Sequence, residues 1–470
     1  MREGPLLRLR VTCREGLVSA LVASPARNDK VRELQRTLYR AAKADPGRRF
    51  HALYDKVHRR DVLERAWVNV RRNRGAAGID RITITEVEQY GVSRLLEELA
   101  ADLKDGSYRP LAARRVWIDK PGSTQRRPLS IPTVRDRIVQ AATKIVIEPV
   151  FEADFLPCSF GFRPQRAQQD ALQVLIDEAW QGRRWVVESD VASCFEAIPH
   201  DRLLQAVEER ICDRHVLKLL RGMLRAGVMQ DGAVHRPVTG TPQGGVVSPL
   251  LANVYLHRLD RVWETDGVGV LVRYADDLIV LCRTRQEAER ALAALTALLA
   301  DLGLAPKASK TRIVHLEEDG EGFDFLGFHH RWVRAASKRH RHVLFLARWP
   351  SNKAMQHARD RIRELTARRR LWLPVEEIVR DVNRVLRGWA EYFRYGNSAR
   401  HLDKIRNYAL ERLALIVAKR HKRSRAFGWS VVAFQSPNQC GLIRLDGIVV
   451  APRPHRDWRG KPNAGGEGRR

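Results

Sequence analysis

The sequence lacks the features that mark several classes of protein. It has six cysteines in 470 residues, and none of them forms a Cys-x-x-Cys pair. This scatter argues against a disulfide framework, a zinc ribbon or a cysteine-based zinc nuclease module, and it is typical of a reducing compartment. No apolar run approaches the roughly 18 residues that a membrane span needs. The run Leu17–Ala23 is at the short limit for a signal-peptide core, so we expect a cytoplasmic protein in which it forms part of the fold or a leader.

Acidic residues are also scarce relative to basic ones. The 84 Lys and Arg outnumber the 55 Asp and Glu, which gives a net charge of +29 and a pI near 10.6. Such a surplus favours a polyanionic partner, most often nucleic acid. A ribosomal-type protein, a membrane-surface protein and a merely basic, soluble protein are the alternatives. The hydrophobic share of 44% and the 11 tryptophans indicate a chain that folds.

Two adjacent aspartates, Asp276 and Asp277, stand between the short apolar runs LVRY and LIVLC. The two-residue gap between these runs predicts a tight hairpin of two strands. A third aspartate, Asp190, lies near the end of WVVESDV, which is typical of a buried strand. If these strands are neighbours in one sheet, the carboxylates converge, and such hard oxygen ligands suit Mg²⁺. The alternative is ordinary turn chemistry, because Asp tolerates hairpin geometry.

The remaining pattern predicts helices on both sides of this region. Residues 28–43 have helical spacing and begin at Asn28, a residue type that caps helices. Beyond Pro350 the chain carries apolar stripes interleaved with Arg and Lys, which is typical of a helical domain with a charged face. The final stretch is rich in Pro, Gly and Arg and predicts disorder. We therefore expect an N-terminal leader and helix (1–50), a main domain (51–335), a helical domain (336–425) and a short basic C-terminal segment (426–470).

Nine motifs occur in a fixed order along the chain, and together they resemble those of the reverse transcriptases encoded by bacterial group II introns, the intron maturases. Any one of them is weak evidence, whereas nine in order are a specific signal. They are RGAAGID (74–80), KPGSTQRRPLSIPTVRDRIVQ (120–140), SFGFRP (159–164), ESDVASCFEAIPH (188–200), TGTPQGGVVSPLLANVYLHRLD (239–260), RYADD (273–277), ASKTRI (308–313), GFDFLGF (322–328) and RGWAEYFRYG (387–396).

The resemblance implies an α+β fold of the right-hand polymerase type. Fingers and palm, with the carboxylates on an antiparallel palm sheet, precede an α-helical thumb known as maturase domain X. Asp190, Asp276 and Asp277 then resemble the palm triad that binds two Mg²⁺ ions, with the backbone carbonyl of Val191 as a further ligand. Lys310 resembles the lysine that protonates the leaving pyrophosphate. A solvated lysine on a loop is the alternative for Lys310.

The resemblance also implies a dNTP pocket. Phe195 resembles the bulky residue that excludes a ribose 2′-hydroxyl, although plain core packing is the commoner fate of a Phe. Either Arg126 or Arg127 is expected to neutralise the triphosphate, and the loop before them is one residue longer than the family spacing, so both stay candidates. The expected pocket residues are Lys120, Arg126, Arg127, Arg163, Phe195, Gln243 and Gly244.

RNA contacts are expected at both ends of the polymerase region. Arg74 and Gly75 resemble the N-terminal extension that grips the template backbone, and Arg387 and Arg394 are the basic residues of the helical motif RGWAEYFRYG. Three aromatic residues of that motif lie at i, i+3 and i+4, so they share one helix face. We interpret that face as a core stripe rather than an RNA-binding surface. The three aromatic residues are Trp389, Tyr392 and Phe393.

The function implied is RNA-templated DNA synthesis from dNTPs on a DNA primer. A second implied role is that of a maturase that binds intron RNA, promotes splicing and supports target-primed retrotransposition. The only cysteine past position 282 is Cys440, so we expect no cysteine-containing endonuclease module after the thumb. The rival hypotheses are a domesticated relative in defence or repair and an RNA-binding splicing cofactor without polymerase activity. Ser248-Pro249 argues against the related diversity-generating enzymes. The oligomeric state is not predicted.

Overall fold

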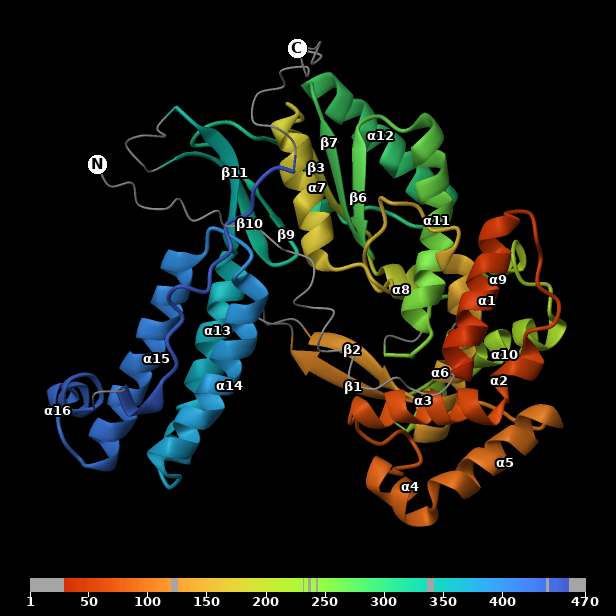
Figure 1. The fold of residues 1–470 in the computed structure, drawn as a ribbon, viewed down its shortest axis with the longest axis horizontal. Helices are drawn as coiled ribbons and strands as arrows, with labels where there is room; N and C mark the ends of the chain where they lie inside the picture. The colour runs from red at the N-terminus through yellow and green to blue at the C-terminus, as the bar shows by residue number, and fades with distance from the viewer. Residues whose placement is uncertain are drawn as a thin grey trace, which may run out of the picture.

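The chain forms a mixed α/β region followed by a mostly helical region (Figure 1). The computed structural model describes residues 29–119, 126–230, 232–235, 238–241, 244–335, 342–436 and 439–455. The predicted site residues Lys120 and Gln243 lie outside these ranges, as do the expected leader and the basic tail. Across the described ranges, no helix combines the length and the apolar character that a bilayer span requires.

The first helices pack on one long, buried helix. The helix α1 begins one residue later than the sequence suggested, because Asp29 rather than Asn28 is its cap and accepts a hydrogen bond from the backbone N–H of Arg32. The helix α6 is buried along most of its length and contacts α1, α2 and α3. The elements of this part are α1 (Lys30–Ala44), α2 (Tyr54–Val57), α3 (Arg60–Arg72), α4 (Ile84–Tyr90), α5 (Val92–Lys104) and α6 (Val134–Glu152).

The predicted strands around the aspartates pair in one four-stranded sheet, hereafter the carboxylate sheet. Its order is β6 (Val270–Tyr274), β7 (Asp277–Cys282), β3 (Trp185–Asp190) and β8 (Arg312–His315), and every pairing is antiparallel. The expectation of an antiparallel sheet with a tight β6–β7 hairpin is thus confirmed. This sheet is the frame on which the candidate site is built.

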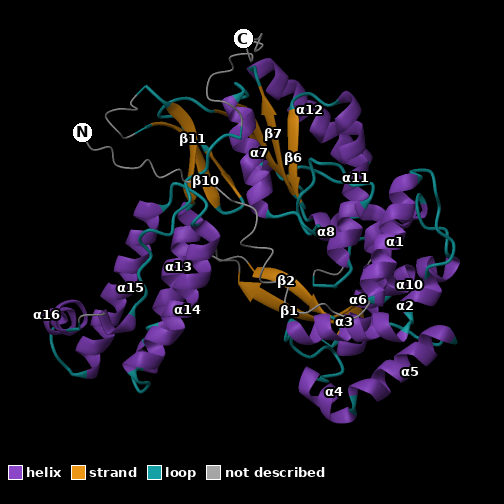
Figure 2. Ribbon diagram, viewed as in Figure 1, coloured by secondary structure: helices purple, strands orange, loops and turns teal. Residues whose placement is uncertain are grey.

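Helices cover both faces of the carboxylate sheet (Figure 2), which explains why its strands are continuously apolar. Side chains alternate along β7: Ile279 and Leu281 face the cluster that contains α7, while Leu278 and Val280 face the large core formed with α11 and α12. The helices involved are α7 (Gln168–Trp180), α8 (Cys194–Ala197), α9 (His200–Glu208), α10 (Arg214–Arg225), α11 (Ser248–Asp266) and α12 (Arg285–Asp301).

Two further sheets flank the carboxylate sheet. One has the order β2-β1-β4-β5, in which β1 and β2 form an antiparallel pair and β4 runs parallel to β1. The other has the order β11-β10-β9 and leads into the helical region. Their strands are β1 (Ala113–Asp119), β2 (Arg126–Ile131), β4 (Val228–Gln230), β5 (Ala233–His235), β9 (Phe323–Phe325), β10 (Phe328–Arg334) and β11 (Leu344–Pro350).

The helical region has a hydrophobic core of its own. Its helices are α13 (Asn352–Leu365), α14 (Val375–Phe393), α15 (Ala399–Arg420) and α16 (Arg425–Trp429). Buried residues of α13–α15 form one cluster that also includes Val432, Leu442 and Leu445. In packing terms this core therefore extends past position 425, where the sequence pattern suggested the helical domain would end.

An aromatic joint connects the helical region to the strands before it, and we define it as Phe328, Tyr392 and Phe393. The ring centroids of Phe328 and Phe393 are 4.9 Å apart, and those of Phe328 and Tyr392 are 5.8 Å apart. The Tyr392 hydroxyl donates to the carbonyl of Leu326 at 3.0 Å. The interpretation of Trp389, Tyr392 and Phe393 as a core stripe is confirmed, because all three pack in the cluster around Phe328.

Replacing Phe393 with alanine should weaken this joint. The lost ring is buried, and such a truncation costs about 3–5 kcal/mol. We expect a clearly lower Tm by differential scanning fluorimetry, with the helical region unfolding first in limited proteolysis. Tyr392→Phe, which removes only the hydrogen bond to Leu326, is the matched control and should cost about 1 kcal/mol. Equal Tm values for Phe393→Ala and wild type would contradict the joint.

Candidate active site

The three predicted aspartates meet where two strands of the carboxylate sheet end. Asp190, the last residue of β3, pairs across the sheet with Asp277, the first residue of β7. Asp276 precedes it in the hairpin turn, and its carbonyl accepts a hydrogen bond from the backbone N–H of Val191 at 3.1 Å. The two strand ends are therefore tied together at the backbone, and the expected convergence of the carboxylates follows from their register.

Two lysines approach the carboxylates from the turn before β8. The Lys310 ammonium lies 2.9 Å from Asp190 Oδ1 and 3.9 Å from Asp277 Oδ1, and the Lys307 ammonium lies 4.0 Å from Asp190 Oδ2. The backbone N–H of Lys307 donates to the Asp190 carbonyl at 2.7 Å, which fixes this turn against β3. Lys310 is thus not a freely solvated loop lysine, and Lys307 is a neighbour that the sequence did not single out.

Burial and mutual repulsion raise the pKa of two of the carboxyls. Desolvation raises the pKa of Asp276, and the charge of Asp190 adds to this while Lys310 and Arg127 oppose it. Desolvation, a hydrogen bond with Asp190 and the charge of Asp276 raise the pKa of Asp277 to about 7. With all three carboxyls ionised, the cluster would therefore hold more negative charge than its surroundings neutralise.

Lys310 responds to the same charges in the opposite sense. Its partial burial would lower its pKa, but the hydrogen bond with Asp190 and the nearby carboxylates outweigh this effect, so its pKa is raised. The ammonium accordingly stays protonated at neutral pH. In that state it can donate a proton or neutralise an anion, and it cannot act as a base.

The donor set fits a hard divalent cation. Two carboxylates converge, a third adjoins them, and an ammonium already lies between the first two, where a cation is electrostatically favoured. Within the described ranges, no three His, Cys, Asp or Glu side chains complete a metal site by themselves. The remaining ligands of such an ion would have to be backbone carbonyls, water or substrate oxygens, as is usual for Mg²⁺.

A fully buried arginine, Arg273, holds the turn that carries Asp276. Its guanidinium pairs with Asp260, with Nε 2.7 Å from Oδ1, and this pair has no exposed surface on either side chain. The same guanidinium donates to the Ala275 carbonyl at 3.1 Å and to Asn253 Oδ1 at 2.9 Å. Burial alone would raise the pKa of Asp260, but Arg273 outweighs it and the net direction is downward, so the ion pair stays charged.

The segment SFGF (Ser159–Phe162) completes the support behind the turn. Ser159 Oγ accepts from Arg273 at 2.8 Å, and the carbonyl of Gly161 accepts from the Asn253 amide at 2.7 Å. A Cβ at Gly161 would lie 2.5 Å from the Ala275 backbone nitrogen, so only glycine allows this approach. Ala275 itself has a φ of +58°, a strained value for a residue with a side chain.

Arg163, expected to support the dNTP pocket, is a buried residue. Its guanidinium pairs with Glu152 at 2.7 Å and donates to the carbonyls of Leu156 and Ser159, each at 2.7 Å. Only 4% of its side chain is exposed. These contacts favour a role in holding the SFGF segment over direct contact with a nucleotide.

Phe195 follows Asp190 closely in the chain, and Gly244 lies on a segment that contacts β2. Phe195, in α8, is half-buried against the main core, and its carbonyl accepts from the backbone N–H of Thr241 at 2.5 Å. Gly244 has a φ of +112°, and a Cβ there would lie 2.5 Å from the Ser130 carbonyl of β2. The absence of a side chain at Gly244 therefore allows its backbone to pack closely against β2.

The basic residues expected to contact phosphates have different surroundings. Arg126 and Arg127 are adjacent, exposed residues at the start of β2, and Arg127 is close enough to Asp276 to influence its pKa. Arg74 is exposed with a φ of +45°, and the neighbouring loop is held by Arg137, which donates to the Ala76 carbonyl.

On the helical region the two expected RNA contacts differ as well. Arg387 is exposed on α14, whereas Arg394 pairs with Glu391 at 3.1 Å and lies over the Tyr395 ring. Arg387 is therefore the better placed of the two to meet a phosphate.

A groove of about 530 Å³ connects the carboxylates to the start of α13. Asp190, Asp277 and Lys310 line one end, and Ser351, Lys353 and His357 line the other. The groove therefore opens the carboxylates toward the helical region.

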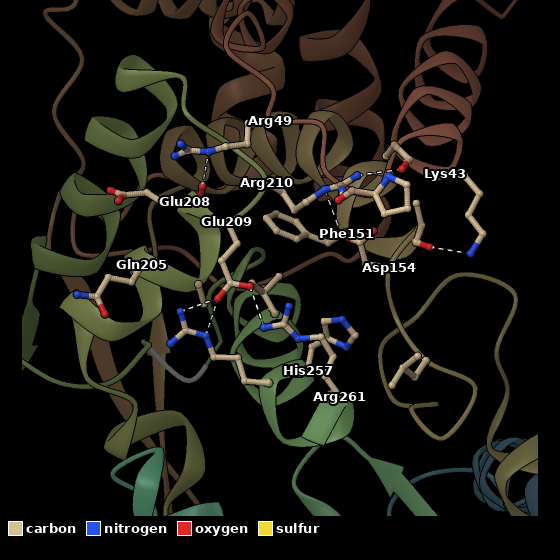
Figure 3. Close-up of a pocket in the computed structure, with 17 residues that line it drawn as sticks. Lys43, Arg49, Phe151, Asp154, Gln205, Glu208, Glu209, Arg210, His257 and Arg261 are labelled. Carbon is tan, nitrogen blue, oxygen red and sulfur yellow. Dashed lines mark hydrogen bonds and ion pairs between the residues drawn. The ribbon is translucent and has the colours of Figure 1, made fainter. Parts of the chain in front are cut away.

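A larger cavity, of about 870 Å³, lies between α1, α6, α9 and α11 (Figure 3). None of the site residues above lines it. Its charged side chains are engaged with one another: Arg210 pairs with Asp154 at 3.2 Å, and Arg258 and Arg261 both pair with Glu209. We therefore place the candidate active site at the carboxylates and not at this cavity.

Comparison with known proteins identifies two matching families. Residues 118–330 match the family model described as reverse transcriptase (RNA-dependent DNA polymerase), and residues 355–432 match the group II intron, maturase-specific domain. The chain is 38% identical over 214 residues to the group II intron-encoded protein LtrA of Lactococcus lactis subsp. cremoris, a match that covers 45% of this chain and 35% of LtrA. The chain therefore aligns with about a third of the length of LtrA.

A second relative is matched over most of its length. The chain is 32% identical over 348 residues to protein YkfC of Escherichia coli K12, which covers 66% of this chain and 90% of YkfC. An uncharacterized 91 kDa protein in the cob intron of Schizosaccharomyces pombe is 38% identical over 170 residues, which covers 36% of this chain and 21% of that protein.

Neutralising Asp277 should stabilise the protein at alkaline pH. A carboxyl whose pKa is raised in the folded state loses stability as the pH rises from about 4 to 7, the interval between its unfolded and folded values. In EDTA, Asp277→Asn should therefore match wild type near pH 4 and have a higher Tm at pH 8. The gain is modest, about 1–3 °C, since 41% of the Asp277 side chain is exposed.

Asp319→Asn is the matched control for this experiment, because Asp319 is 96% exposed and far from the cluster in sequence. It should not change the pH dependence of Tm. An unchanged Tm for Asp277→Asn at pH 8 would refute the idea that the ionised Asp277 carboxylate destabilises the folded protein.

Changing Arg273 should damage the turn more than it damages the fold. Arg273→Lys keeps the charge beside Asp260 but cannot reach Asn253, Ser159 and the Ala275 carbonyl together. We expect kcat for nucleotide addition to fall about 10–100-fold with little change in KM, as a misplacement of about 1 Å would produce. Arg273→Met, which leaves Asp260 buried and unpaired, should cost about 3–5 kcal/mol.

Arg348→Lys serves as the control, because Arg348 is another buried arginine and lies in β11, where it donates to the Tyr395 carbonyl. It should lower Tm without lowering the kcat of the folded fraction. A normal kcat for Arg273→Lys would exclude the positioning role.

Proposed function

Because the chain belongs to the family of group II intron-encoded reverse transcriptases and maturases, we propose that it is an RNA-directed DNA polymerase of the right-hand type. The carboxylate sheet is the centre of the palm, and the β2-β1-β4-β5 sheet with the helices around α6 forms the fingers. Helices α13–α15 form the thumb. The groove between the carboxylates and α13 would then hold the end of the primer.

The chemistry would take place at Asp190, Asp276 and Asp277. Two bound Mg²⁺ ions would supply the positive charge that activates an attacking 3′-hydroxyl and stabilises a leaving pyrophosphate. The residues that would hold them are the three aspartates and the backbone carbonyl of Val191. Lys310, which is protonated at neutral pH, would donate a proton to the pyrophosphate or neutralise it as it leaves.

The nucleotide would be bound from the side of Phe195 and Gly244. The half-buried Phe195 ring has one side free of the core, and there it would exclude a ribose 2′-hydroxyl. Arg127 is exposed and close enough to Asp276 to influence its pKa, which makes it the stronger candidate for the triphosphate, and Arg126, also exposed, remains the alternative. Lys120 and Gln243 remain members of this pocket by prediction.

A second proposed role is that of a maturase acting on intron RNA. The basic helical region would bind the RNA through phosphates, with Arg387 on α14 and Arg74 in the N-terminal loop as contacts. Splicing of that RNA and target-primed retrotransposition into DNA would follow from the two activities together.

The observation that carries this proposal is the cross-strand pair of Asp190 and Asp277, with Asp276 beside it and Lys310 between the carboxylates. A purely RNA-binding cofactor has no use for this arrangement. The cluster is electrostatically costly, so a chain that did not need it would be more stable without it. A domesticated relative would keep the polymerase site and lose only the link to an intron.

Primer extension on poly(rA)/oligo(dT) with Mg²⁺ and dTTP tests the polymerase. Asp276→Ala should lower the rate by about 1,000-fold or more, since a lost metal ligand removes several kcal/mol of transition-state stabilisation. Binding of the same primer–template, followed by fluorescence anisotropy, should be unchanged.

Asp301→Ala, which removes an exposed aspartate from α12, is the control and should leave the rate unchanged. Extension by Asp276→Ala at the wild-type rate would refute the site. Wild-type protein that binds RNA but never extends a primer would favour the splicing-cofactor alternative.

A further inference from the structure

The loop between α13 and α14 exposes an aromatic residue that neither the fold nor the polymerase site uses. Trp372 is 79% exposed, which makes it the most exposed large aromatic among the described residues. It lies at the end of α14 opposite to the aromatic joint, so the 19-residue helix separates it from the strands by about 28 Å (Figure 1). Tryptophan is enriched where proteins contact their partners, because its ring is apolar and its N–H is polar.

The loop is held rigidly in the conformation that turns Trp372 outward. Its neighbours Leu371 and Leu373 pack against the core of the helical region, so the side chains alternate between inward and outward. Arg420 of α15 donates to the carbonyls of both leucines. Arg370 donates to Asp381 of α14 at 2.5 Å. The ring is therefore presented at a fixed place, with little ordering left to occur when a partner binds.

Two arginines beside Trp372 are left available to an anion. Arg369 is 73% exposed, and its nearest acidic partner, Glu364, is 3.8 Å away. Arg368 is exposed in the same short turn. Between Arg361 and Glu377 the loop region carries five arginines against three glutamates. Two of those glutamates, Glu376 and Glu377, occupy the first turn of α14, so an anion would approach from the side of Arg368 and Arg369.

An exposed indole next to cationic guanidinium groups is the chemistry that binds an unpaired nucleotide. Every base offers a face for stacking, and its phosphates can be met by adjacent arginines. A duplex cannot use this surface in the same way, because its bases are already stacked on one another. A partner protein would use the ring too, but the local excess of positive charge and the net charge of +29 favour RNA.

We propose that Trp372, with Arg368 and Arg369, is a stacking site for an unpaired nucleotide of a bound RNA, separate from the polymerase groove. The proposal rests on the RNA-binding role suggested for the helical region and is independent of polymerase activity. It adds a site at the far end of that region, where the RNA would be gripped by a base rather than only by its phosphates.

Binding of a fluorescein-labelled 12-nucleotide single-stranded RNA to the full chain, already saturated with an unlabelled, blunt-ended RNA/DNA duplex, tests the site by anisotropy. Trp372→Ala should weaken this binding about 5–100-fold, the range of one stacked base. Trp372→Phe should retain most of the affinity. Arg368→Ala with Arg369→Ala should lower the slope of log affinity against log salt by about 1–2.

Tyr90→Ala is the control, because Tyr90 is a half-exposed aromatic on α4 and should leave the affinity unchanged. In a second readout, a 5-bromouridine-containing RNA of the same length should cross-link on ultraviolet irradiation to the peptide that contains Trp372, as identified by mass spectrometry.

Primer extension by Trp372→Ala should stay at the wild-type rate with an unchanged Tm, whether or not the polymerase proposal itself holds. Unaltered single-strand binding by Trp372→Ala and no cross-link at this peptide would overturn the inference. A loss of primer extension at unchanged Tm would overturn it as well, because the loop would then belong to the primer–template site.

Discussion

The buried guanidinium of Arg273 is the contact on which the candidate site depends. It joins the β6–β7 turn, helix α11 and the SFGF segment, which are distant in sequence, through Ala275, Asn253, Asp260 and Ser159. A buried ion pair of this kind adds little net stability, since desolvation offsets the attraction. What the contact provides is a single geometry for a turn whose backbone would otherwise relax away from the strained conformation at Ala275.

This constraint explains how three carboxylates can be held together. Their repulsion and burial favour protonation, as the raised pKa values of Asp276 and Asp277 indicate. A flexible hairpin would relieve that strain by moving the side chains apart. The rigid support from behind, together with Lys310 in front, keeps them close at neutral pH. The repulsion among the carboxylates lowers the stability of the folded protein, and in return their positions are fixed before cations and substrate bind.

The sequence predicted the local elements of this site well and their support poorly. The strands at Asp190 and around Asp276 and Asp277 and the tight hairpin follow from short apolar runs and a two-residue gap, whereas the antiparallel sheet was implied by the resemblance to intron-encoded reverse transcriptases. Arg273 stood within the RYADD motif, yet its partner Ser159 lies 114 positions away, and no local pattern reveals such a contact. The one feature of the sequence that pointed to a structural role for Arg273 was its position as a charged residue inside an apolar strand. Arg163 was placed on the nucleotide side because of its motif, whereas its side chain turns back to Glu152.

The aromatic joint gives the helical region the mechanics of a lever. Phe328 and Phe393 form the pivot, and the long α14 carries the Trp372 loop at about 28 Å from it. On an arm of that length, a rotation of about 10° at the pivot displaces the far end by about 5 Å, close to the rise of one helical turn. A rotation too small to disturb the packing of two rings would thus become a displacement of several ångströms at the far end of α14.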